Sequence, residues 1–392
     1  MNKIYLDNAA TTPVRKEVVD AMLPYFTENF GNPSSVYQIA QINKKAIDES
    51  RETIAKLIGA QTNEIFFTSG GSEANNWAIK GIAESKKAKG NHIITTKVEH
   101  HAVLHTCEYL EKHGYEVTYL DVDENGLVCP NAVEAAIKET TILISIMYAN
   151  NEIGTIMPIK EIGEIAKKHN VTLHTDAVQA IGQIKVDVKA ENIDLLSLSA
   201  HKINGPKGVG VLYIRRGLRV ENLIHGGAQE RGRRAGTENV AGVVGLAKAM
   251  ELAYTDFEEK IVKMTALRDK LIKGLLDAIP YTRLNGHTTR RLANNANIGV
   301  EYVEGESLLL LLDMQGISAS SGSACTSGSL DPSHVLLALG IPHERAHGSI
   351  RFTLGNQTTE EEIQTVIDKM PAIVQRMRDM SPLWEEVTKT QK

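Results

Sequence analysis

The chain of 392 residues is poor in cysteine and in aromatic residues, with three Cys, two Trp and six Phe. So few cysteines, and an odd number, exclude a framework of disulfides and are typical of a reducing compartment. The longest apolar runs, at residues 142–149 and 308–312, are far shorter than the roughly 20 residues that span a bilayer. The opening MNKIYLDNAATTP has no apolar stretch of the kind a secretory signal needs. We therefore expect a soluble cytoplasmic protein without membrane contact.

The chain also lacks a strong excess of positive or negative charge. The chain has 43 Lys and Arg against 48 Asp and Glu, for a formal net charge of −5. A slightly acidic protein is a poor partner for nucleic acid, and the short basic cluster at residues 231–234 does not change that expectation. The apolar fraction of 42% and charged fraction of 23% are those of a globular chain. The length exceeds one ordinary hydrophobic core, so more than one domain is expected.

Short apolar runs alternate with amphipathic helical segments between about residues 60 and 215. The runs lie at residues 65–67, 92–95, 117–121, 142–148, 171–175, 195–198 and 209–214. Helical periodicity is clearest from Glu73 to about Lys87 and from Ile159 to about His169. This alternation predicts an α/β fold with a mostly parallel sheet covered on both faces by helices.

The second part of the chain has a different pattern. A long helical region runs from about residue 238 to 279, with a polar patch near residues 255–260. Short strands at 296–300 and 349–353 and helices at 305–314 and about 359–380 follow it. We predict a large domain of residues 15–255, and a small α+β domain of residues 1–14 and 256–392.

The segment TSGGSE at residues 68–73 lies between a predicted strand and a predicted helix. Small residues at such a turn let the N–H groups of the helix N-terminus face an anion. The alternative is an ordinary strand-to-helix turn with Ser72 as the helix N-cap. The segment matches neither a Walker loop nor a dinucleotide-binding glycine motif.

Two charged residues follow later strand runs. Asp176 directly follows the run at 171–175, and Lys202 comes soon after the run at 195–198. Ligands in open α/β sheets bind at the carboxyl ends of strands, although an Asp there also caps helices and a Lys also serves as a solvated charge. An amine, a carboxylate and a phosphate cradle are what a pyridoxal phosphate site requires. Together the three features predict such a site.

Six motifs occur in an order that resembles one known family. They are EHHAV at 99–103, NNEIGT at 150–155, the segments around Asp176 and Lys202, RGRRAGTEN at 231–239, and SSGSACTSGS at 320–329. Together they resemble the cysteine desulfurases of the NifS/IscS group, pyridoxal-phosphate enzymes of the aminotransferase class V family. The resemblance runs from YLDNAATTP at 5–13 to SPLW at 381–384. It implies fold type I of the pyridoxal-phosphate enzymes, with a large mixed, mostly parallel sheet and a smaller α+β domain.

The resemblance also implies roles for single residues around the cofactor. Lys202 matches the lysine that binds the cofactor covalently, and Asp176 matches the partner of its pyridine nitrogen. His100 would lie over the ring and assist proton transfers. Gln179 and Asn151 match residues near the phenolic oxygen of the cofactor and the substrate.

Further matches concern the phosphate and the substrate. The residues that match the phosphate cradle are Gly71, Ser72, Ser199 and His201. Thr237 would reach the phosphate from the other subunit of a homodimer. Arg351 matches the arginine that holds the α-carboxylate of the substrate, a task that suits the planar guanidinium.

The three cysteines have different surroundings. Cys107 lies on an apolar helical face, as a buried structural thiol would, and Cys129 precedes Pro130 in a predicted loop. Cys325 lies among Gly, Ser and Thr, a composition typical of an exposed loop. The resemblance identifies Cys325 as the thiol that receives sulfur.

The implied reaction removes sulfur from L-cysteine, gives L-alanine and leaves a persulfide on Cys325. An iron–sulfur scaffold protein is the implied acceptor. A selenocysteine lyase or another class V enzyme of the same fold is the alternative, as is a sulfur carrier without catalysis. The cysteine loop argues against the former, and Lys202, Asp176 and His100 argue against the latter. A nitrogenase-specific and a housekeeping role stay open, although the CTSGS form of the cysteine motif favours the NifS type.

The histidines near residue 100 offer a metal site as an alternative. His101 and His105 share one helical face, at a spacing that suits a pair of ligands. No acidic or cysteine partner stands at a matching distance in the sequence, and the resemblance places His100 over the cofactor. We therefore expect no resident metal, and contact with a metal cluster only when the Cys325 persulfide meets a scaffold protein.

Overall fold

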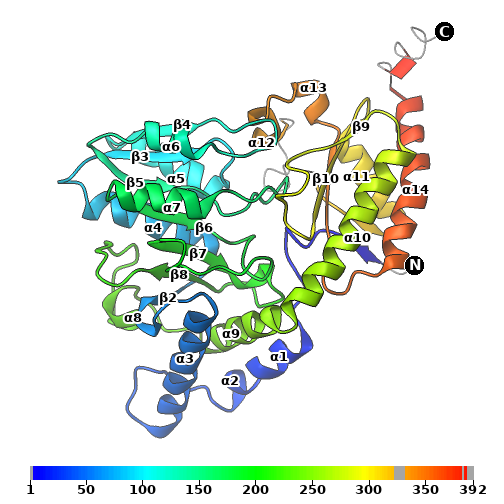
Figure 1. The fold of residues 1–392 in the computed structure, drawn as a ribbon. Helices are drawn as coiled ribbons and strands as arrows, with labels where there is room; N and C mark the ends of the chain where they lie inside the picture. The colour runs from blue at the N-terminus through cyan, green and yellow to red at the C-terminus, as the bar shows by residue number, and fades with distance from the viewer. Residues whose placement is uncertain (1–2, 322–331, 382–383, 386–392) are drawn as a thin grey trace.

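The computed structural model of the chain describes residues 3–321, 332–381 and 384–385. Its largest element is a seven-stranded sheet with the strand order β2-β8-β7-β6-β5-β3-β4 (Figure 1). The strands are β2 (Ile65–Thr68), β3 (His92–Thr96), β4 (Glu116–Leu120), β5 (Thr141–Ser145), β6 (Thr172–Asp176), β7 (Leu195–Ser199) and β8 (Gly210–Ile214). Strand β8 pairs antiparallel with both of its neighbours, and the other pairs are parallel. The predicted α/β fold with a mostly parallel sheet is confirmed.

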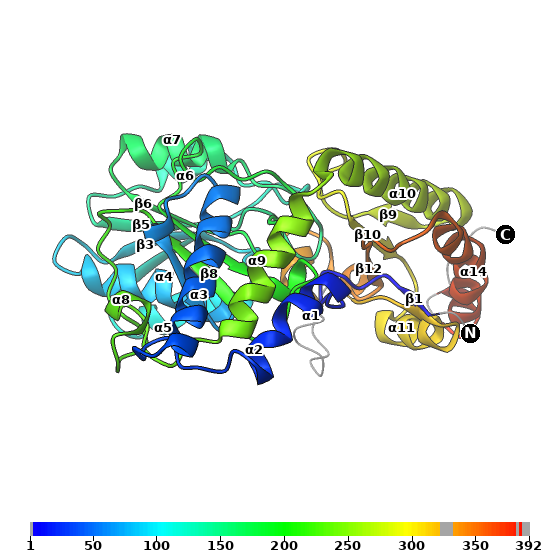
Figure 2. The same cartoon turned by 90° about the horizontal axis from the view of Figure 1, so that it is seen from below.

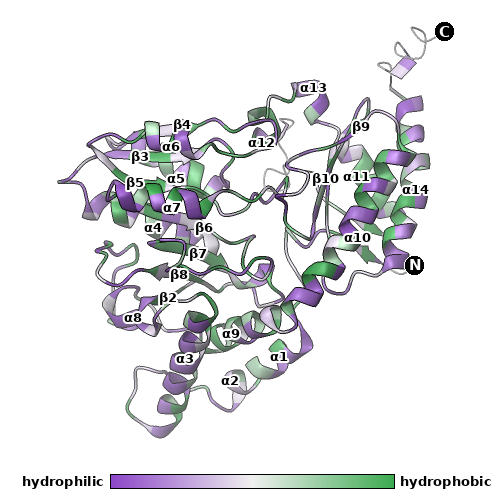
Figure 3. Ribbon diagram, in the orientation of Figure 1, coloured by the Kyte–Doolittle hydropathy of each residue, from purple (hydrophilic) through white to green (hydrophobic). Residues whose placement is uncertain are grey.

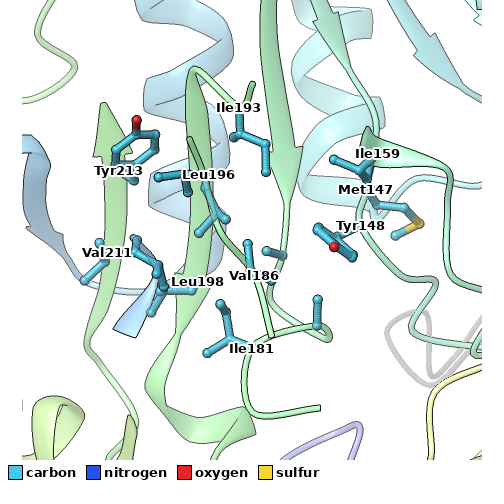
Figure 4. Close-up of a cluster of buried hydrophobic side chains, with 14 of the residues drawn as sticks. Met147, Tyr148, Ile159, Ile181, Val186, Ile193, Leu196, Leu198, Val211 and Tyr213 are labelled. Atoms are coloured by element: carbon cyan, nitrogen blue, oxygen red, sulfur yellow. The ribbon is translucent and has the colours of Figure 1, made fainter. Parts of the chain in front are cut away.

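Alternate residues of the strands belong to two hydrophobic clusters, one on each face of the sheet. Leu195 packs with α4 (Gly71–Ser85) and α5 (His101–Glu111), while Leu196 packs on the other side. The second face is covered by α3 (Gln38–Leu57), α7 (Ile159–Lys168) and α9 (Val240–Tyr254). Figure 4 shows part of this cluster, in which Leu196 and Leu198 lie beside Val211 and Tyr213. Burial of both faces explains why the central strands read as continuous apolar runs.

A smaller unit is built around a three-stranded antiparallel sheet with the order β12-β10-β9. Its strands are β9 (Thr282–Leu284), β10 (Asn295–Val300) and β12 (Ser349–Thr353), and its helices are α10 (Phe257–Ala278), α11 (Gly305–Met314) and α14 (Glu360–Asp379). Buried residues of α14 recur every three or four positions, and Figure 3 shows its polar and apolar residues alternating along the helix. A short parallel pair, β1 (Ile4–Tyr5) with β11 (Ile317–Ser318), joins the chain's first strand to this unit.

The passage between the two units coincides with the polar patch noted in the sequence. Helix α9 ends at Tyr254 and α10 begins at Phe257, with Asp256 in the left-handed region at φ 48° (Figure 2). Val335 and Leu336, which follow α10 in sequence, nevertheless pack in the cluster of the large sheet. The domain boundaries given above stay a prediction.

The remaining described elements are short. They are α1 (Lys16–Met22), α2 (Pro24–Thr27), α6 (Pro130–Ala135), α8 (Gln229–Gly232), α12 (His334–Ala338), α13 (His343–Ala346) and the 3-10 turns η1 (Thr62–Glu64) and η2 (Ala200–Lys202). None of the helices in the described ranges combines the length and apolar character that crossing a bilayer demands.

Candidate active site

A cavity of about 370 Å³ lies at the carboxyl ends of β6 and β7. Ten of the predicted site residues line it: Gly71, Ser72, His100, Asn151, Asp176, Gln179, Ser199, His201, Lys202 and Arg351. Thr237 is exposed and is not among the lining residues, and Cys325 lies outside the described residues. The structure thus brings together side chains that are up to 280 positions apart in the sequence.

Asp176 is the last residue of β6, and its side chain is held by two donors. The side-chain amide of Asn75 donates to Oδ2 over 2.6 Å, and the backbone N–H of Val178 donates to Oδ1 over 3.0 Å. Asn75 is buried, also lines the cavity, and its own Oδ1 has no partner in the described part of the chain. The sequence did not single out Asn75. A signal was present, because Asn75 lies on the same face of α4 as the apolar Ala78 and Ile82 and interrupts that face.

Lys202 closes the 3-10 turn η2 directly after β7, so its side chain starts at the same sheet edge as Asp176. Its Nζ donates to the carbonyl oxygens of Ala9 and Ala10 over 2.6 and 2.8 Å. Gln179 donates to the same Ala9 carbonyl over 3.1 Å. The N-terminal segment therefore supplies acceptors to the lysine, a contribution that the sequence alone did not indicate.

The turn between β2 and α4 forms another wall of the cavity. A Cβ on Gly71 would lie 2.7 Å from a methyl group of Val178, so a larger residue does not fit there. Gly71 and Ser72 begin a helix of 15 residues, whose first N–H groups form a site for an anion. Glu73 stabilises this turn, because its carboxylate accepts from the N–H of Ser69 and from two nitrogens of Arg234.

His201 lies beside the cavity in a partly buried position. Burial, together with the positive charges of Lys202 and Lys207, lowers the pKa of His201 to about 4. The ring is therefore neutral at pH 7, with Nδ1 in hydrogen-bond contact with the Thr11 hydroxyl at 3.1 Å. A neutral imidazole at this place can donate one hydrogen bond to an anion without adding a charge.

His100 is the N-cap of α5, and its Nδ1 accepts from the N–H of Ala102 over 3.1 Å. A neutral ring that accepts at Nδ1 carries its proton on Nε2. His101 turns away toward His105 and His334, with ring centroids 4.9 and 4.7 Å apart. Burial and the neighbouring imidazoles lower the pKa of His101 to about 4. The described ranges hold no group of three side chains placed to bind a metal.

Arg351 comes from the middle of β12 in the smaller unit and is buried. One terminal nitrogen donates to the carbonyl of Asn151 over 3.0 Å, and the other donates to Asp7 over 3.0 Å. Its Nε has no partner in the described part of the chain. A buried guanidinium with unused N–H groups on the wall of a cavity is a site for a carboxylate.

Comparison with known proteins gives one consistent result. The aminotransferase class V family profile matches residues 4–366. The chain belongs to this family. It is 63% identical over 380 residues to cysteine desulfurase IscS of Methanosarcina thermophila, covering 97% of this chain and 94% of that protein. It is 59% identical to cysteine desulfurase IscS of Clostridium botulinum strain Hall, over 99% of both chains.

Solved structures give the same family. A NifS-like protein matches with a TM-score of 0.90 and 39% identity, over 95% of this chain and all of the other. A structure described as SspA in complex with cysteine matches with a TM-score of 0.78 and 38% identity, over 91% of this chain and all of the other. The fold, the cysteine desulfurase group and its pyridoxal phosphate cofactor are thereby shown.

The cavity of this class V enzyme fits pyridoxal phosphate. It combines an amine on Lys202, a carboxylate on Asp176 and an anion-binding helix N-terminus at Gly71 within one space of about 370 Å³. Its walls also include Gly71, where a Cβ would meet Val178, and Asn75, whose Oδ1 has no partner among the described residues. The amine, the carboxylate and the helix N-terminus are the partners that the aldehyde, the pyridine ring and the phosphate of the cofactor need.

The desulfurase also needs a thiol, and two of its cysteines are in the described residues. Cys107 is fully buried in α5, and burial, followed by the charge of Glu99, raises the pKa of its thiol well above the ordinary value. Cys129 is exposed before α6 and does not line the cavity. The prediction that Cys107 is a buried thiol is confirmed. Neither thiol is placed to meet a substrate in the cavity.

Proposed function

We propose that the chain removes sulfur from L-cysteine with the side chains of this cavity, and that the sulfur passes to Cys325. The observation that carries the proposal is the convergence of Lys202, Asp176 and the N-terminus of α4 in one cavity whose further wall is the buried Arg351. A carboxylate-bearing amino acid fits between these groups. The structure described as SspA in complex with cysteine supports L-cysteine as the substrate.

When bound, pyridoxal phosphate supplies an electron sink for a carbanion at the substrate Cα. Asp176, fixed by Asn75 and the N–H of Val178, would hold the pyridine nitrogen. The N-terminus of α4 would hold the phosphate together with the cavity-lining side chains of Ser72, Ser199 and His201. Gln179 and Asn151 also line the cavity, and by the resemblance they would lie near the phenolic oxygen and the substrate.

Two residues move protons in this proposal. The ε-amine of Lys202 takes the proton from Cα and returns it, because it is the amine that lines the cavity beside Asp176. His100 exchanges protons through Nε2, since its Nδ1 is occupied by the N–H of Ala102. The α-carboxylate lies on Arg351, which fixes the orientation of Cα toward Lys202.

The last step transfers sulfur to Cys325. The thiolate attacks the substrate sulfur, a new S–S bond forms, and the carbon–sulfur bond breaks with its electron pair staying on Cβ. Cβ takes up a proton, so L-cysteine and a thiol give L-alanine and a persulfide. The buried Cys107 and the remote Cys129 leave Cys325 as the thiol for this step. A scaffold protein for iron–sulfur clusters is the acceptor that we propose, as the resemblance to the NifS/IscS group implies.

We further propose a homodimer. Large apolar side chains are exposed along α2 and its flanking segments up to the start of α3: Leu23 at 54%, Phe26 at 60%, Phe30 at 71%, Val36 at 93% and Tyr37 at 54%. Contact with a second copy would remove this surface from water. The exposed Thr237 lies outside its own chain's cavity, as a residue that serves the neighbouring cavity would.

Release of alanine from L-cysteine by the purified holoenzyme tests the function. We expect one alanine per sulfur delivered to a thiol reductant, and catalytic turnover. Turnover of L-selenocysteine with none of L-cysteine would favour the selenocysteine lyase instead. An enzyme that binds the cofactor and releases no alanine from either substrate would overturn both.

A further inference from the structure

The N-terminal segment at residues 5–13 contacts both halves of the proposed active site. Its Asp7 contacts Arg351 of the smaller unit, and its Ala9 and Ala10 accept from Lys202 of the large sheet. Thr11 contacts His201. Residues that bind the substrate and residues that bind the cofactor thus share one connecting segment.

Within this segment Asp7 makes the contact that bears on substrate binding. Its Oδ1 accepts from Nη2 of Arg351 over 3.0 Å, and the side chains of Arg351 and Asp7 are only 4% and 17% exposed. An ion pair shielded from water in this way holds its geometry more strongly than a surface pair does. Asp7 is therefore able to fix which edge of the guanidinium faces the cavity.

Asp7 is itself held in place from three sides. Its Oδ2 accepts from the hydroxyl of Ser320 over 2.9 Å. Its backbone carbonyl accepts from the hydroxyl of Tyr5 over 3.1 Å, and its backbone forms a bridge with Thr353 on β12. Because both carboxylate oxygens have a partner, the carboxylate has one orientation.

The contacts of Arg351 show what this orientation leaves for a ligand. Asn151 and Asp7 each take one N–H from a different terminal nitrogen. The Nε–H has no partner among the described residues, and each terminal nitrogen has a second N–H besides the one that these bonds use. A carboxylate in the cavity can form its two parallel hydrogen bonds with these groups only while the guanidinium keeps this rotation.

We infer that Asp7 is a positioning residue that orients Arg351 and thereby sets the affinity of the enzyme for the α-carboxylate of its substrate. The inference rests on the proposed function of Arg351 as the carboxylate-binding residue. It predicts an effect on ligands with a carboxylate and none on ligands without one. A merely structural role of Asp7, as a link between β1 and β12, would affect both alike.

The test uses inhibition constants of the holoenzyme for L-alanine, which has the carboxylate, and for cysteamine, which lacks it. In Asp7→Ala we expect the constant for L-alanine to rise about tenfold or more, as for a lost hydrogen bond to a charged group. The constant for cysteamine and the cofactor affinity should each stay within about threefold, because neither depends on a carboxylate held by Arg351. Asp7→Asn keeps an oxygen that accepts from Arg351, so it should restore most of the affinity for L-alanine.

Two further variants keep the result interpretable. Ser320→Ala frees one carboxylate oxygen of Asp7, so it should raise the inhibition constant for L-alanine by about threefold and leave that for cysteamine unchanged. This variant tests the inference even if Asp7→Ala does not fold. The control Asp20→Asn, which breaks an exposed ion pair with Lys16 on α1, should change neither constant. An equal rise for both ligands, or no rise in Asp7→Ala and Ser320→Ala, would overturn the inference.

Arg351→Ala separates this inference from the function on which it rests. If Arg351→Ala weakens the binding of L-alanine and Asp7→Ala does not, the role inferred for Asp7 is wrong and that of Arg351 stands. If Arg351→Ala leaves L-alanine binding unchanged, the assignment of the carboxylate to Arg351 is wrong, and the inference about Asp7 is overturned with it.

Discussion

The side-chain amide of Asn75 donates a hydrogen bond of 2.6 Å to the carboxylate of Asp176, across 101 positions of the sequence. Asn75 stands in the first turns of α4, the helix whose N-terminus forms the anion site at Gly71 and Ser72. The same helix therefore contacts the residue proposed for the pyridine nitrogen and begins at the site proposed for the phosphate. In this proposal the contact fixes the separation of the two ends of the cofactor site.

Asn75→Ala should lower kcat about tenfold, because Asp176 loses one of its two donors and its fixed orientation. The absorption maximum of the bound cofactor should shift as well, since its ring nitrogen has a displaced partner. Both are measured on the holoenzyme, with Asn91→Ala as the control for a surface amide. A variant with native kcat and spectrum would show that Asn75 only fills space.

Much of the fold was predictable from the sequence because it depends on local pattern. All seven strands of the large sheet overlap the predicted apolar runs, since burial of the central strands on both faces favours apolar residues there. The helix from Gly305 to Met314 and the strand from Ser349 to Thr353 match their predicted bounds. The break at Asp256 appeared as a polar patch.

The contacts between distant segments were not predictable in the same way. Asn75 and Asp7 act through partners 101 and 344 positions away, and such pairing leaves no periodic signal. The carbonyls of Ala9 and Ala10 that accept from Lys202 are backbone groups, which the sequence does not mark. Motif resemblance assigned roles to side chains, whereas the structure adds the residues that hold them.

Lys202 should be the lysine that binds the cofactor covalently. Borohydride treatment of the holoenzyme followed by peptide mapping should find the cofactor on Lys202, because its amine lines the cavity next to Asp176. Lys202→Arg should abolish turnover, whereas Lys207→Arg, at an exposed position nearby, should leave it near native. Cofactor fixed to Lys207 or Lys185 would refute the assignment.

Glu99 should make the stability of the protein depend on pH. Its side chain is fully buried against Thr96 and the N–H of Met147, and burial raises its pKa from 4.5 to about 8. Between these values the unfolded chain has lost the proton and the native protein keeps it. The contribution of Glu99 to the free energy of unfolding is therefore fully present below about pH 4.5 and is lost as the pH rises toward 8.

Glu99→Gln removes this titration and keeps the size of the side chain. Relative to the wild type, the free energy of unfolding of the variant should increase by on the order of 1 kcal/mol per pH unit between pH 6 and 8. Denaturant unfolding at several pH values measures the difference, with Glu108→Gln on the exposed side of α5 as the control. A constant difference across this range would mean that Glu99 does not hold a proton.

The homodimer should depend on the exposed apolar residues near the N-terminus. Phe26→Glu combined with Phe30→Glu should give a monomer in sedimentation with reduced cofactor affinity, because Thr237 of a second copy would no longer be supplied. Leu310→Glu, at a residue 68% exposed on α11, is the matched control and should leave the dimer intact. A native-like dimer of the double variant would place the interface elsewhere.

The central claim is that sulfur passes from L-cysteine to Cys325, and mapping the persulfide tests it most directly. The holoenzyme is given L-cysteine labelled in sulfur, the thiols are trapped by alkylation, and each cysteine peptide is analysed. The account predicts the label on Cys325. It also predicts that Cys325→Ala keeps its cofactor and loses alanine release by a factor of about 1,000 or more, while Cys107→Ala and Cys129→Ala stay near native. Label on Cys107 or Cys129, or normal turnover in Cys325→Ala, would contradict it.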